Sequence, residues 1–145
     1  MKRRRLFRKL ISIAYIIFGI TSCIVLLKDI DLPNEIRSYF RFGYYSQYGQ
    51  IVISIELAIA GFNLFLNHEK TNFVMALFGF TAIFDIVCSF LNSSQTYISI
   101  IFLCFALASL KIAFYNSFNS GKISKVIVAI TFVFGLITEL FFNYL

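Results

Sequence analysis

The chain has 145 residues, of which 59% are hydrophobic and 14% are charged. A soluble globular domain is about 45–50% apolar and about 25% charged, so this composition excludes an ordinary water-soluble fold. The formal net charge is +6, but the basic residues gather before the first apolar run instead of covering a soluble face. We therefore expect a lipid bilayer as the environment of the chain and no nucleic acid partner. The basic N-terminal cluster consists of Lys2, Arg3, Arg4, Arg5, Arg8 and Lys9.

Five apolar runs predict five membrane-spanning helices. Each run is close to the roughly 20 residues that a spanning helix needs, and the second is the shortest. The first run has a basic flank and a Cys23 that resembles a lipoprotein cleavage box, but it continues past this cysteine, so we expect it to be retained. Lipoprotein processing stays a minor alternative. The predicted helices cover residues 10–27, 51–66, 73–91, 97–115 and 123–142.

The long connection over residues 28–50 predicts an interfacial segment. It opens with acidic residues around Pro33, a pattern typical of a helix start. Tyrosines and phenylalanines then alternate with Arg37 and Arg41. Aromatic side chains prefer the level of the lipid headgroups, so we expect an outer loop or helix that lies on the membrane.

The other connections are short, which predicts antiparallel neighbouring helices and one membrane domain over residues 1–145. The fold class is therefore an all-α integral membrane protein, a bundle of five transmembrane helices. Four glycines inside the runs predict close helix contacts. They are Gly19, Gly61, Gly79 and Gly135.

The distribution of basic residues predicts a multi-pass protein with its N terminus in the cytoplasm and its C terminus outside. In this orientation the inner segments hold the N-terminal cluster, Lys70, Lys111, Lys122 and Lys125. The outer segments hold Lys28, Arg37 and Arg41, balanced by Asp29, Asp31 and Glu35. The corresponding location is the inner (cytoplasmic) membrane of a cell.

Two carboxylates interrupt the second and third runs. Glu56 and Asp85 would both lie roughly 8–9 Å below the outer boundary at 1.5 Å rise per residue. Ionisable groups inside a bilayer are costly and are functional candidates by default. The predicted intramembrane polar site consists of Glu56, Asp85, Asn63, Thr81 and Glu139.

Two interpretations of this site stay open. Either the acids line a polar pocket that opens to the outer side, or they only hold helices together. In the second case Lys28, Arg37 and Arg41 are the candidate charge partners. The sequence leaves the catalytic residues unassigned and the question of an enzyme open, with a non-catalytic role favoured.

The cysteines provide a further candidate site. Cys23 and Cys88 are expected at matched depth and form a candidate thiol pair, whereas Cys104 lies in the outer half of the fourth run. A cysteine inside an apolar run is most often a small hydrophobe. The chain has one histidine, His68, and no cluster with metal-ligand spacing, so no metal site is predicted.

The first three runs resemble the DoxX/MauE-like group of small bacterial membrane proteins. Lys28 after the first run, Glu56-Leu57 in the second and the following Gly61 match the pattern, although the spacing from Glu56 to Gly61 is one residue longer than usual. The resemblance implies a four- or five-helix bundle, here a four-helix core plus one, in a bacterial inner membrane. It also implies a link to redox metabolism through a quinone or through thiols.

Three functions follow as hypotheses. The first is a non-catalytic accessory subunit of a larger membrane complex, which needs no enzymatic chemistry from this chain and binds other membrane or periplasmic subunits. The second is a DoxX/MauE-like redox accessory with a polar site at Glu56 and Asp85, for which a quinone is the one cofactor considered. The third is proton or small-solute transport, for which five helices offer no inverted repeat.

Overall fold

The computed structural model describes residues 2–30, 48–91 and 97–144. Its regular elements in these ranges are the helices α1 (Lys2–Lys28), α3 (Gly49–Leu66), α4 (Thr71–Leu91), α5 (Tyr97–Phe114) and α6 (Lys125–Tyr144). All five are long and apolar enough to cross a membrane. The prediction of an all-helical bundle with five membrane-spanning helices is therefore confirmed.

The largest boundary difference concerns the first helix. The apolar run predicts a start at residue 10, but α1 begins at Lys2. Lysine and arginine are good helix formers, so the helix continues through the basic cluster after the apolar residues have ended. The predicted interfacial segment cannot be compared, because residues 31–47, with Arg37 and Arg41, lie outside the described residues.

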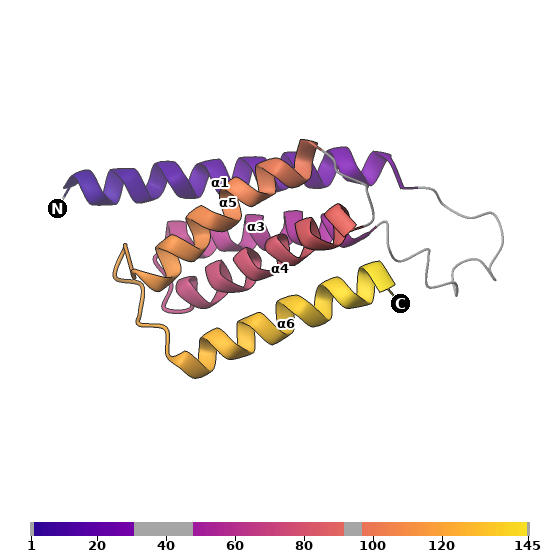
Figure 1. The fold of residues 1–145 in the computed structure, drawn as a ribbon. Coiled ribbons are helices and arrows are strands. Elements are labelled where there is room, and N and C mark those ends of the chain that lie inside the picture. Colours follow the sequence, from indigo (N-terminus) through magenta and orange to yellow (C-terminus); the bar gives the residue numbers. More distant parts are fainter. Residues whose placement is uncertain (1, 31–47, 92–96, 145) are drawn as a thin grey trace.

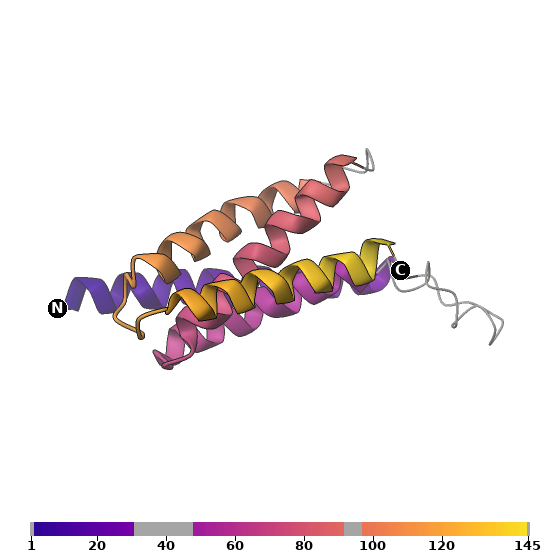
Figure 2. The same ribbon diagram turned by 60° about the horizontal axis from the view of Figure 1, so that its bottom comes forward.

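Helices α3 and α4 form the centre of the bundle (Figure 1). Helix α1 packs along α3, whereas α5 and α6 both pack against α4. The N and C termini lie at opposite ends of the molecule in both views (Figures 1 and 2). We call the end that holds the N terminus, the α3–α4 turn and the α5–α6 connection the basic end.

The predicted close contacts at glycines are confirmed. A Cβ atom built on Gly19 would lie 2.7 Å from the backbone nitrogen of Ala58, and one on Gly61 would lie 2.9 Å from that of Ile16. Both glycines therefore allow the backbones of α1 and α3 to approach each other. Gly79 faces Leu110 of α5, and Gly135 faces α4.

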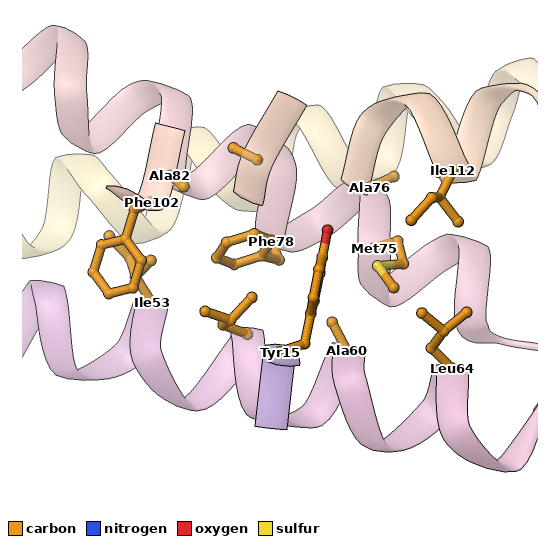
Figure 3. Close-up of a cluster of buried hydrophobic side chains, with 13 residues drawn as sticks. Tyr15, Ile53, Ala60, Leu64, Met75, Ala76, Phe78, Ala82, Phe102 and Ile112 are labelled. Carbon is orange, nitrogen blue, oxygen red and sulfur yellow. The ribbon is translucent and has the colours of Figure 1, made fainter. Parts of the chain in front are cut away.

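The core is built from side chains of four helices (Figure 3). Phe78 of α4 is fully buried and faces the ring of Tyr15 edge-on, with the ring centroids 6.4 Å apart. The Tyr15 hydroxyl donates to the carbonyl of Phe105 at 3.1 Å and accepts from Ser109 at 2.9 Å. Both partners belong to α5, so this tyrosine joins α1 to α5 across the bundle.

The outer surface of the bundle is apolar. Phe134 and Ile137 of α6 are 57% and 56% exposed, and Ile17 of α1 is 57% exposed. Such a continuous apolar exterior is the kind of surface that a bilayer covers. Ser12 of α1 and Thr131 and Glu139 of α6 are fully buried and lie on the faces that pack inside the bundle.

Candidate functional site

Four of the five predicted polar residues lie together in the half of the bundle away from the basic end. We call Glu56, Thr81, Asp85 and Glu139 the polar seam. Thr81 and Glu139 are fully buried, and Asp85 is 4% exposed. A Cβ atom on Gly135 would lie 3.0 Å from the Thr81 backbone nitrogen. Since α4 and α6 run in the same direction, Glu139, one turn beyond Gly135, is level with Asp85, one turn beyond Thr81.

The carboxyl group of Glu56 on α3 lies near the hydroxyl of Thr81 on α4. The same hydroxyl lies 3.0 Å from the carbonyl oxygen of Leu77, to which it donates. Thr81 therefore bonds its own helix and at the same time lies beside Glu56 of the neighbouring helix.

Asp85 of α4 lies near the hydroxyl of Ser99 at the start of α5. The amide of Gln50 in the first turn of α3 donates to the same serine at 3.2 Å. The Gln50 amide and the Ser99 hydroxyl can thus act as donors in sequence toward the carboxylate. This short chain joins three helices through polar groups at one level.

One oxygen of each of these two carboxyl groups stays unbonded. Oε2 of Glu56 and Oδ2 of Asp85 are buried and have no hydrogen-bond partner among the described residues. Buried polar atoms in native structures are usually hydrogen-bonded, and one without a partner carries a desolvation cost of about 1–3 kcal/mol. These two oxygens are the part of the seam where a ligand or a proton could be accepted.

The fifth predicted residue does not join this group. Asn63 lies two turns from Glu56 toward the basic end, and its side-chain amide donates to the Ile59 carbonyl of its own helix at 2.9 Å. Its backbone carbonyl accepts from the Thr71 hydroxyl at 3.0 Å. Asn63 therefore shapes the α3–α4 turn and does not take part in the polar seam.

The predicted charge partners are not seen beside the acids. Lys28 is exposed at the last residue of α1, and no basic residue of the described ranges pairs with Glu56 or Asp85. Arg37 and Arg41 lie outside these ranges. Within the described structure, hydroxyl and amide groups take the place of the predicted cations.

The candidate thiol pair is not bridged. Cys23, Cys88 and Cys104 are all free; Cys23 is half-buried, Cys88 is buried and Cys104 is exposed. Cys23 belongs to α1, which packs mainly on α3, whereas Cys88 belongs to α4, which packs on α3, α5 and α6. The two thiols therefore come from helices that do not share a main packing interface.

Metal binding finds no support in the described part of the chain. No group of three or more His, Cys, Asp or Glu residues there is close enough to hold a metal ion. The acids of the polar seam are thus neighbours along the helices but do not converge on one point. What the arrangement can do is accept or donate single protons and hydrogen bonds.

The sequence predicted the acids and Thr81, but it did not predict Gln50 and Ser99, the polar groups beside Asp85. A signal for Ser99 was present, because it lies on the buried face of α5 with Phe102, Ala106 and Ser109. This spacing follows the helical period, and the rule that small residues face a bundle interior would have found it. Gln50 carries no such signal, since a glutamine at a helix start is usually solvated.

No protein family model, curated protein or solved structure matches this chain.

Proposed function

We propose that this chain is a non-catalytic, multi-pass subunit of a larger complex in a bacterial inner membrane. The observation that carries the proposal is that several buried polar side chains join helices of this chain to one another. Tyr15 of α1 bonds two residues of α5, and Gln50 of α3 bonds Ser99 of α5, beside which Asp85 lies. Groups used in this way stabilise a scaffold, and a scaffold acts through the proteins that it binds.

The proposed orientation places the basic end in the cytoplasm. Among the described residues, nearly all lysines and arginines belong to this end, and Lys28 is the exception. An excess of lysine and arginine on cytoplasmic segments is the rule for multi-pass proteins. The C terminus and the polar seam then lie toward the outer side, where membrane or periplasmic subunits are the proposed partners.

A redox accessory role is the second candidate, and the unbonded oxygens of Glu56 and Asp85 favour it. A quinone site needs apolar walls and one or two polar groups for the carbonyl oxygens. A protonated carboxyl group can donate a hydrogen bond to such a carbonyl. The resemblance of the first three helices to the DoxX/MauE-like group points in the same direction.

Affinity purification from native membranes tests both candidates. The wild-type chain is compared with Glu56→Gln/Asp85→Asn and with a control, Glu69→Gln, which removes an exposed charge in the α3–α4 turn. We expect all three to recover the same partner in constant proportion by mass spectrometry, because glutamine and asparagine keep the shape of the acids and their capacity for hydrogen bonds.

The outcomes separate the proposals. A wild-type protein that is monodisperse and recovers no partner contradicts the subunit function. Solvent extraction of the purified samples tests the redox accessory role, because it releases any bound quinone. Quinone that is recovered with the wild type and with Glu69→Gln but is lost in the double variant would favour the redox accessory.

A further inference from the structure

A small cavity lies at the basic end, on the opposite side of the bundle from the polar seam. It has a volume of about 170 Å³ and lies between the first turns of α1 and the α5–α6 connection. Three arginines of α1 and three residues of the connection line it. The lining residues are Arg4, Arg5, Arg8, Ser117, Phe118 and Asn119.

The arginines share one face of α1. Arg4 and Arg8 are one turn apart, and Arg5 is adjacent to Arg4 around the helix. The connection is held against this face, because the rings of Phe7 and Phe118 contact each other at 6.5 Å between centroids. The cavity is thus formed by two parts of the chain that are more than 100 residues apart in sequence.

Arg8 is fixed in place by a hydrogen bond. Its Nη1 donates to the side-chain oxygen of Asn67 in the α3–α4 turn, and Ser120 donates to the same oxygen at 3.3 Å. Nε of Arg8 is buried and has no hydrogen-bond partner among the described residues. A positive charge is therefore held at the cavity wall.

The lining of this cavity is complementary to an anion. It contains three guanidinium groups and no acidic residue. Like charges around one small space repel each other, and a bound anion removes this cost. Arginine matches phosphate oxygens with two parallel hydrogen bonds, and the Ser117 hydroxyl and the Asn119 amide add neutral donors.

The position of the cavity indicates where such an anion would come from. Arg8 and Lys9 directly precede the apolar run that begins at Leu10, so the cavity lies at the level of the lipid headgroups. The phosphodiester of an anionic phospholipid reaches this level from the membrane. A soluble phosphate ion reaches it from the aqueous side.

We propose that Arg4, Arg5 and Arg8 form a binding site for a phosphate group at the basic end. The group belongs to an anionic phospholipid or is a free phosphate, and the two share the same chemistry. The basic cluster then has a role in addition to orientation, because it binds a ligand together with the α5–α6 connection. This inference does not depend on the proposed subunit function.

Binding to delipidated protein in detergent tests the site. The probes are a short-chain phosphatidylglycerol, a phosphatidylcholine of the same chain length, and inorganic phosphate. The variant Arg4→Gln/Arg5→Gln leaves Arg8 and its bond to Asn67 intact. The control Arg3→Gln/Lys111→Gln removes the same charge from two exposed residues that do not line the cavity.

We expect saturable binding of phosphatidylglycerol that is at least about tenfold weaker in Arg4→Gln/Arg5→Gln, since two charge-assisted contacts are lost. The control should bind within about twofold of the wild type, because distant surface charges are screened. Binding of phosphatidylglycerol alone assigns the site to lipid, and equal binding of inorganic phosphate assigns it to the phosphate group itself. Absence of saturable binding of either, or an equal loss in the control, would overturn the proposal.

Discussion

Replacing Gly61 by alanine is expected to lower the free energy of unfolding by about 1–3 kcal/mol, the usual cost of forcing one methyl group into a filled space. The new Cβ atom would lie 2.7 Å from Cβ of Tyr15 and 2.9 Å from the backbone nitrogen of Ile16. A backbone cannot rotate away as a side chain can. Helix α1 would have to move off α3, and the packing of Tyr15 on α5 would be lost with it.

The corresponding substitution on the other side of this interface, Gly19→Ala on α1, should lower the free energy of unfolding in the same way. Its Cβ atom would lie 2.7 Å from the nitrogen of Ala58 and 2.8 Å from the carbonyl oxygen of Ser54. The matched control is Gly79→Ala, for which the nearest atoms, at 2.7 Å, belong to the flexible side chain of Leu110. Unfolding in mixed detergent micelles measures all three variants. Equal losses at the three glycines would contradict the interpretation that backbone atoms limit the space at Gly19 and Gly61, whereas a movable side chain limits it at Gly79.

Truncating Phe78 to alanine should cost about 3–5 kcal/mol, the range for removing a fully buried aromatic ring. Phe78 is 0% exposed and stands in the centre of the core, beside Tyr15 and Ile53 (Figure 3). Its edge-to-face contact with Tyr15 adds to the packing that is lost. Lipid cannot fill the resulting space, because four helices surround it.

The control for this substitution lies on the same helix. Phe90 of α4 is 69% exposed, so in the membrane its ring contacts lipid instead of protein. Phe90→Ala exchanges one lipid contact for another and should change the unfolding free energy by less than about 0.5 kcal/mol, as is usual for surface substitutions. A Phe90→Ala cost equal to that of Phe78→Ala would show that α4 is not the central helix of the bundle.

The sequence predicts the five helices because hydropathy is a local property. A run of apolar residues must span the bilayer whatever its neighbours are, so four of the five starts agree within two residues. The contacts of Gly19, Gly61, Gly79 and Gly135 were also predictable, since small residues are the ones that let helices approach in lipid. The start of α1 was missed because the apolar run begins only at Leu10. The basic residues before it are polar but are good helix formers, so the helix begins earlier, at Lys2.

The polar groups beside Asp85 were not predictable from the sequence, for a different reason. Whether Asp85 bonds a cation or a hydroxyl depends on how α4 crosses α5, and no local pattern encodes that crossing. Lys28, Arg37 and Arg41 were candidate partners in one of two open interpretations because charge is visible in a sequence, whereas the structure brings Ser99 and Gln50 together beside Asp85. The arginine cavity was missed likewise, since it needs the α5–α6 connection to fold back on α1.

The most direct test of this account is a double-mutant cycle between Glu56 and Thr81. The unfolding free energy is measured for the wild type, Glu56→Met, Thr81→Val and the double variant. If the polar seam joins helices, the pair should show a coupling energy of about 0.6–1.7 kcal/mol, as interhelical hydrogen bonds in membrane proteins do. Strict additivity of the two substitutions would contradict the account, because it would mean that the Glu56 carboxyl does not hold α3 to α4.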